Sequence, residues 1–162
     1  LMKIIFQSVS VLLCAFILFA CPYESVVPID SPTVPLDKKL IGTWKKLNAE
    51  DESYVISERD EYTFNIEKRG KSESDTEHFW GYESHVDGIR FLNILRVGPT
   101  DTLSKFFFYK IDLNTDSIRL FELTENIDEE FSTSASLKNF ISNNLKNTYF
   151  FNKEEINYIR VL

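Results

Sequence analysis

The chain has 162 residues and a formal net charge of −7, and its 14 Phe, 7 Tyr and 2 Trp outnumber its 5 Gly and 5 Pro. This length suits one domain, and the aromatic-rich composition excludes a mostly disordered or collagen-like chain. A net acidic chain without a long basic run lacks the electrostatic signature of nucleic-acid binding, so we expect no nucleic-acid partner.

The first 20 residues have the pattern of an export signal. Lys3 precedes an unbroken apolar run from Val11 to Ala20. As a helix this run would span about 15 Å, half of a hydrocarbon core of ~30 Å. It is too short for a permanent membrane span and typical of a signal-peptide core, so residues 1–20 are predicted to be a signal peptide.

The next feature is the run from Leu18 to Cys21, Leu-Phe-Ala-Cys, which resembles a bacterial lipobox. The resemblance implies that Cys21 carries a diacylglycerol and becomes the first residue of an exported protein anchored to a bacterial membrane. The expected location is the outer membrane, facing the periplasm or the surface. Phe19 is bulkier than this family usually has there. The alternative is an ordinary secretory signal that ends near a cysteine.

Only two cysteines are present, Cys14 and Cys21. If the first leaves with the signal and the second carries lipid, no disulfide or free thiol remains. Cysteine nucleophiles and thiolate metal sites are then excluded.

Four of the five prolines lie between residues 22 and 36. Proline fixes φ and removes a hydrogen-bond donor, so this stretch is predicted to be an extended, semi-rigid tether. With the lipidated Cys21 the tether covers residues 21–36, and the folded domain is expected over residues 37–162.

Within that domain, apolar residues alternate with polar ones between turn signals, as in all-β sandwiches and barrels. The pattern predicts eight strands at 42–47, 54–57, 62–67, 77–86, 89–97, 103–113, 118–124 and 155–162. Asp87-Gly88 is the strongest hairpin signal. One helix is predicted before the last strand, because Leu137, Phe140, Ile141 and Leu145 share a helical face behind capping residues at 132–134.

The run Gly42-Thr43-Trp44-Lys45 is the most specific motif of the domain. It resembles the Gly-x-Trp opening of the lipocalins and the start of the fatty-acid-binding proteins. The resemblance implies an all-β fold with one C-terminal helix: an eight-stranded antiparallel up-and-down lipocalin-like barrel. It also implies that Gly42 allows close packing, that Trp44 plugs the closed end, and that Arg160, or else Arg119, lies across Trp44.

Two features depart from the fatty-acid-binding proteins. Residues 48–53 leave no room for their helical lid. Tyr158-Ile159-Arg160 reverses their final Arg-x-Tyr. A lipocalin-like barrel is therefore expected without a specific fatty-acid ligand.

The strand over residues 77–86 offers one face that we expect to line a small ligand pocket inside the barrel. The alternative is plain core packing of the same side chains. The pocket candidates are His78, Trp80, Tyr82, Ser84, Asn93, Phe106 and Phe108.

No catalytic motif is present, and the carboxylate pairs at 51–52, 129–130 and 154–155 are interpreted as surface charge. Adjacent strand residues point to opposite faces, so neither His78 with Glu77 nor His85 with Glu83 is expected to hold a metal. We expect no cofactor, no metal and no enzymatic activity.

Two functions remain open. One is a membrane-anchored envelope protein whose barrel binds a small apolar ligand. The other is a protein whose barrel is filled by its own side chains and that acts on an envelope protein partner, as an inhibitor or assembly subunit. A hydrolase is a distant third. A cavity above about 300 Å³ favours the first function, and a filled core with an exposed apolar patch favours the second.

Overall fold

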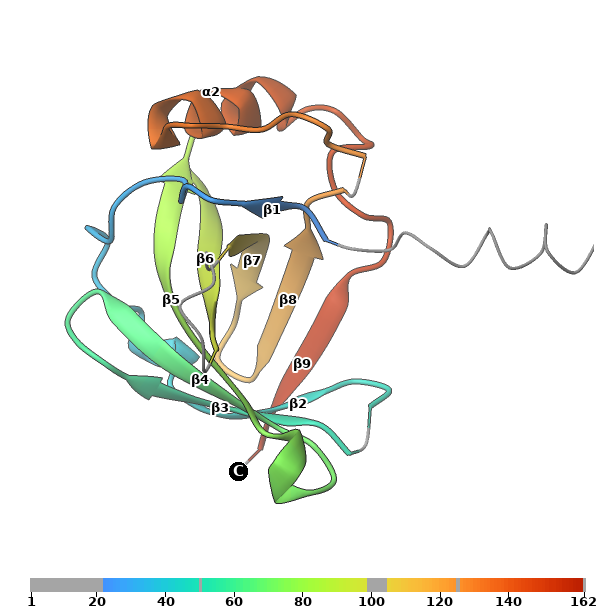
Figure 1. Ribbon diagram of the computed structural model, residues 1–162. Helices are drawn as coiled ribbons and strands as arrows, with labels where there is room; N and C mark the ends of the chain where they lie inside the picture. Colours follow the sequence, from blue (N-terminus) through green and yellow to red (C-terminus); the bar gives the residue numbers. More distant parts are fainter. Residues whose placement is uncertain (1–21, 50, 99–104, 125, 162) are drawn as a thin grey trace, which may run out of the picture.

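Eight antiparallel strands close into a barrel in the computed structural model, which describes residues 22–49, 51–98, 105–124 and 126–161 (Figure 1). Each strand pairs with the next along the chain, and the last pairs with the first, so the predicted up-and-down barrel is confirmed. The strands are β2 (Gly42–Lys46), β3 (Ser53–Glu58), β4 (Thr63–Arg69), β5 (Glu77–Val86), β6 (Ile89–Val97), β7 (Phe106–Leu113), β8 (Ser117–Glu122) and β9 (Ile156–Val161).

Strand boundaries follow the alternation of the sequence closely. The hairpin between β5 and β6 turns at Asp87 and Gly88, whose φ values of 51° and 80° are those of the tight turn predicted there. The strand predicted over 103–113 begins at Phe106 among the described residues, and residues 103 and 104 lie outside them. Two short 3₁₀ helices, η1 (Lys38–Leu40) and η2 (Glu73–Asp75), precede β2 and β5.

One end of the barrel is closed and the other is open. The closed end holds η1 and the turns that follow β3 and β7, whereas the turns after β2 and β4 lie at the open end, which we call the mouth. Side chains that point inward form the first core. Its buried members are Leu36, Leu40, Trp44, Ile56, Phe64, Leu92, Ile94, Ile111 and Ile118.

A second core lies outside the barrel wall. Helix α2 (Ser134–Asn144) packs over β5 with Leu137 and Ile141 fully buried, and Thr133 caps its start by accepting a hydrogen bond from the amide of Ser136 at 3.2 Å (Figure 1). The predicted helix is confirmed, with its cap inside the expected range. The buried members of this core are Tyr23, Ile29, Val86, Phe91, Phe108, Leu123, Leu137, Ile141 and Phe150. Among the residues that the structure describes, no helix is long and apolar enough to cross a membrane.

Residues 22–36, which we call the strap, lie on the barrel wall and close the second core (Figure 1). The two residues of β1 (Glu24–Ser25) pair with Phe107 and Phe106 of β7. Ile29 is 0% exposed and Leu36 is 7% exposed. The prediction that residues 22–36 form a semi-rigid tether outside a folded domain that starts at residue 37 is therefore wrong. The prolines do keep the strap extended, but its apolar side chains bury against the barrel.

Asp30 fixes the middle of the strap. Its carboxylate accepts hydrogen bonds from Ser84 of β5 and from the ammonium of Lys138 of α2, the latter at 2.6 Å. Its backbone carbonyl accepts one from the hydroxyl of Tyr82 at 2.7 Å. Next to it, the Ile29 amide donates to the fully buried side chain of Asn93 at 2.9 Å. Strap, barrel and helix therefore share one polar network, which runs from the buried side chains of Ser84 and Asn93 to the partly exposed pair of Asp30 and Lys138. Leaving one of its buried groups without a hydrogen-bond partner would be costly.

The strap is expected to contribute to stability. Replacing Ile29 by Ala should lower the free energy of unfolding by about 2–5 kcal/mol, because it leaves a cavity between strap and barrel. Val26→Ala in the same strap should change it by less than about 0.5 kcal/mol, because Val26 is 55% exposed. Urea unfolding of the chain without its first 21 residues measures both. If both substitutions left the free energy of unfolding unchanged, the strap would not be packed against the barrel.

Candidate functional site

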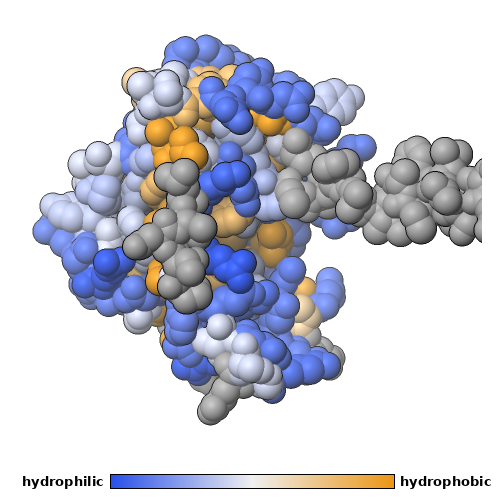
Figure 2. Space-filling view, viewed as in Figure 1, coloured by the Kyte–Doolittle hydropathy of each residue, from blue (hydrophilic) through white to orange (hydrophobic). Residues whose placement is uncertain are grey.

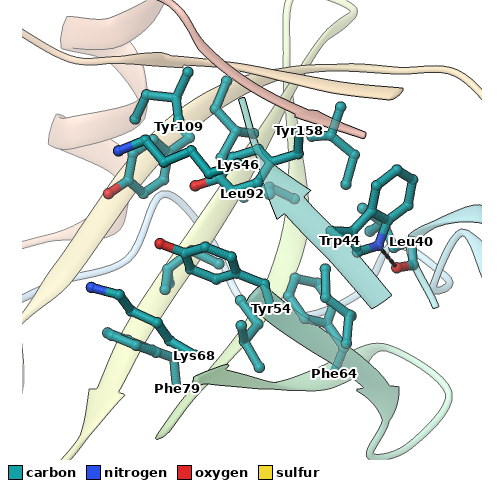
Figure 3. Close-up of a pocket in the computed structure, with 16 residues that line it drawn as sticks. Leu40, Trp44, Lys46, Tyr54, Phe64, Lys68, Phe79, Leu92, Tyr109 and Tyr158 are labelled. Carbon is teal, nitrogen blue, oxygen red and sulfur yellow. Dashed lines mark hydrogen bonds between the residues drawn. The ribbon is translucent and has the colours of Figure 1, made fainter. Parts of the chain in front are cut away.

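The barrel encloses a cavity of about 290 Å³ (Figure 3). Every barrel strand contributes at least one side chain to its wall, and most of these side chains are apolar. The lining residues are Leu40, Trp44, Lys46, Tyr54, Ile56, Phe64, Ile66, Lys68, Phe79, Leu92, Ile94, Tyr109, Ile118, Leu120, Ile156 and Tyr158. An apolar cavity of about 150 Å³ suffices to hold benzene, so this one has room for a ligand of roughly twice that size.

Trp44 forms the floor of the cavity at the closed end. Its side chain is 1% exposed, and its indole N–H donates to the carbonyl of Leu40 at 2.9 Å (Figure 3). The guanidinium of Arg160 lies 4.2 Å from the ring centroid on the other side. Gly42 has a φ of 142°, and a Cβ there would clash with the same guanidinium. The structure thus places Gly42, Trp44 and Arg160 together as the barrel-closing group that the motif predicted, and Arg119 is not part of it.

Arg160 also holds neighbouring segments at the closed end. Its N–H groups donate to the carbonyls of Lys39, Ile41 and Thr115. These carbonyls belong to η1, the residue after it and the turn between β7 and β8. One side chain therefore joins the last strand to the plug and to the adjacent turn.

Polar groups gather at the opposite end of the cavity, towards the mouth. The ammonium groups of Lys46 and Lys68 and the hydroxyls of Tyr54 and Tyr109 point to the same side, away from Trp44 (Figure 3). Lys68 lies 3.6 Å from a carboxylate oxygen of Glu52 and 3.5 Å from one of Glu77. Tyr54 donates to Glu52 at 3.1 Å. The cavity therefore has an apolar floor and a rim of hydrogen-bonding groups.

The rim tyrosines stay neutral at physiological pH. Burial raises the pKa of Tyr158 to about 12 and also raises the pKa values of Tyr54 and Tyr109. The rings of Tyr54 and Tyr158 meet edge to face at 5.1 Å. These phenols are therefore not poised as bases, and because Tyr54 already donates its one proton to Glu52, its oxygen can only accept a further hydrogen bond.

The residues predicted to line the pocket lie elsewhere. Trp80, Tyr82 and Ser84 are on the outer face of β5, and the inward positions of that strand include Phe79 and Gly81. Ser84, Asn93 and Phe108 are buried under the strap and α2, and His78 is exposed on the outer face. The seven candidates do share one surface: His78, Trp80, Tyr82, Ser84, Asn93, Phe106 and Phe108. The expectation that this surface faces inward is wrong, because a second core covers it from outside.

The aromatic rings of this outer surface pack on one another. Trp80 stacks on Tyr82 with centroids 6.0 Å apart, and Phe106 meets both rings edge to face. The guanidinium of Arg59 lies 5.2 Å from the Trp80 ring. Core packing, the alternative interpretation of these side chains, describes what the structure shows.

One histidine does contact a carboxylate. Glu83 and His85 are two residues apart and share a face, so the argument that they point to opposite faces was wrong. His85 Nε2 lies 2.7 Å from Glu83 Oε1. The same carboxylate receives two hydrogen bonds from Arg90, which also contacts Asp37 at 3.1 Å. This cluster ties Asp37, the residue between the strap and η1, to β5 and β6. Over the described part of the chain, no group of three or more His, Cys, Asp or Glu side chains is arranged to hold a metal.

The face shown in Figure 2 has apolar surface at the bottom of a recess bordered by polar side chains.

No protein-family model, curated protein or solved structure matches this chain.

Trp44 is expected to hold the closed end together. Trp44→Ala should lower the free energy of unfolding by about 3–5 kcal/mol, since it removes a fully buried side chain and the ring under Arg160. Leu47→Ala, three residues further along the chain and at a position that is 46% exposed, should be nearly neutral. An unchanged melting temperature for Trp44→Ala would show that the indole is not the plug.

Proposed function

We propose that this protein binds one small apolar ligand inside its barrel and that it does so as an exported, lipid-anchored protein of a bacterial envelope. The cavity of about 290 Å³ is the observation that supports binding. This volume lies just below the size range of small-molecule sites, about 300–1,000 Å³, and just below the threshold of about 300 Å³ set from the sequence, so the ligand must be small.

The lining indicates how such a ligand would lie. An apolar body would pack against Trp44, Phe64 and Ile94 near the floor. A polar end would face the rim, where the ammonium group of Lys46 offers donors. Such a ligand is an amphiphile of modest length, with a hydrogen-bond acceptor at one end.

The rim favours binding over catalysis. Glu52 and Glu77 are both engaged by Lys68, and Glu77 also pairs with Arg96 at 2.8 Å. A general acid or base needs a carboxyl or imidazole poised near neutral pH next to the reacting atom. The rim carboxylates are instead held as ion pairs, so we propose a non-enzymatic role.

The anchor is proposed from the sequence alone, because residues 1–21 lie outside the described part of the chain. Lys3, the apolar run 11–20 and the lipobox-like residues 18–21 support export and lipidation at Cys21.

Replacing Cys21 by Ala should abolish lipidation and leave the protein soluble or unprocessed. A protein with several acyl chains gains about 0.8 kcal/mol per buried CH₂ and should stay in the membrane fraction. Fractionation together with the intact mass of the mature N-terminus measures this. If the variant partitions with membranes as the parent does, the lipidation proposal fails.

Ligand binding is tested on the chain without its first 21 residues, with 1-aminoanthracene as probe. We expect saturable one-to-one binding and energy transfer from Trp44. Trp80→Phe should preserve that transfer, because Trp80 lies outside the barrel wall. Leu120→Trp, which fills the cavity, should weaken binding at least about tenfold, or ~1.4 kcal/mol. Ile159→Trp adds the same bulk to an outward position of β9, 45% exposed, and should leave affinity unchanged.

Absence of saturable binding by the folded parent would count against the binding function. It would favour the alternative of a barrel that serves only as a scaffold for contact with another envelope protein.

A further inference from the structure

The strap enters the fold at the mouth of the barrel. Strand β8 ends at Glu122, which pairs with Tyr109 of β7, and Tyr109 lines the cavity. Beyond that point the edge of β7 is taken over by β1, which pairs with Phe106 and Phe107. The first residues of the strap therefore lie beside the cavity rim, above the end of β8 (Figure 1).

The start of the strap is fixed to the barrel from Tyr23 onward. The Tyr23 side chain is 9% exposed, and its ring centroid lies 6.3 Å from that of Phe108. Its hydroxyl donates to the carbonyl of Glu129 at 3.1 Å. Next along the chain, Glu24 pairs with Lys105 at 3.1 Å. Only Pro22 separates Tyr23 from Cys21, and two residues reach at most about 7 Å.

Exposed apolar side chains flank this entry point. Val26 follows β1 directly and is 55% exposed, and Val97 ends β6 and is 53% exposed. Ser25 and Leu95 pair with the same residue, Phe106, so both valines lie next to this part of the rim. On the opposite side of the mouth the turns carry charges of both signs, such as Lys71 with Asp51 at 2.8 Å. Isolated valines suit an interface with acyl chains, and mixed charges suit a layer of head groups.

We propose that the mouth of the barrel is held against the lipid bilayer, with the closed end pointing away from it. This inference rests on the proposed lipidation of Cys21. The chain that joins the lipid to the rim is too short to lift the barrel, so the cavity opens onto the membrane surface. The bilayer is then the reservoir from which the cavity takes its amphiphile and into which it releases it.

The experiment uses the purified lipidated protein in phosphatidylcholine vesicles that contain a brominated lipid. Apart from Cys21, which carries lipid, the mature chain has no cysteine, so a single added cysteine can carry a fluorophore. Val97→Cys places it at the mouth, and Val161→Cys, at a position that is 39% exposed, places it at the closed end. The two ends are about 20 Å apart for strands of this length and tilt.

We expect the label at 97 to be quenched several-fold more strongly than the label at 161. Equal quenching of the two labels in protein whose mass shows the lipid would overturn the proposed orientation. A mass without the lipid would instead refute lipidation, so the two failures can be distinguished.

A second variant tests whether the short link between Cys21 and Tyr23 causes this orientation. Inserting a Gly-Ser linker of twelve residues between Pro22 and Tyr23 gives a flexible reach of about 20 Å. The difference in quenching between the two labels should then shrink towards zero. Persistence of the full difference would show that the link does not set the orientation.

Discussion

The guanidinium of Arg160 is the contact on which closure of the barrel depends. It stacks on Trp44 at 4.2 Å and donates to the carbonyls of Lys39 in η1, of Ile41 and of Thr115 in the turn after β7. A planar cation with five donors can satisfy these acceptors while it covers an aromatic face, which a lysine cannot do. Because β9 is the last strand and β2 the first, this one side chain joins the two edges of the sheet at the end that must be sealed.

The fold also depends on packing against the outer face of the barrel wall. Strands β5, β6 and β7 carry apolar side chains on both faces, and their outward side chains bury under the strap and α2. Asp30 and Asn93 sit in this layer with their hydrogen bonds made, so they specify where the strap crosses the wall. A barrel of this size would otherwise expose a row of aromatic rings to solvent.

This two-sided burial explains what the sequence could and could not predict. Strand positions follow from alternation and turn residues, and β5 and β6 begin and end where predicted. Trp44 is predicted by a local motif, and Arg160 by the resemblance that this motif carries, which implies an Arg on a late strand. Which side of β5 points into the barrel could not be deduced from the sequence. Trp80 and Tyr82 on one side and Phe79 on the other are all aromatic, so both sides have the pattern of a buried face. The strap was missed because proline content indicates extension but not what an extended chain packs against. The sequence around the rim residues does not distinguish a side chain at the cavity mouth from one on the outer surface. It therefore did not predict Lys46, Lys68 and Tyr54.

The same arrangement explains why the barrel retains space inside. Trp80 and Tyr82 of β5 point outward, and the inward position between them is Gly81, where a Cβ would come within 2.6 Å of Ile94 and 2.8 Å of the Asn93 carbonyl. Small barrels of eight strands are usually just wide enough to be filled by their own side chains. Here Phe91, Phe106 and Phe108 of the wall pack into the outer core with the strap and the helix. Part of the stability is therefore supplied from outside the wall, and the interior keeps a cavity whose floor is sealed by Trp44 and whose rim lies where the strap begins.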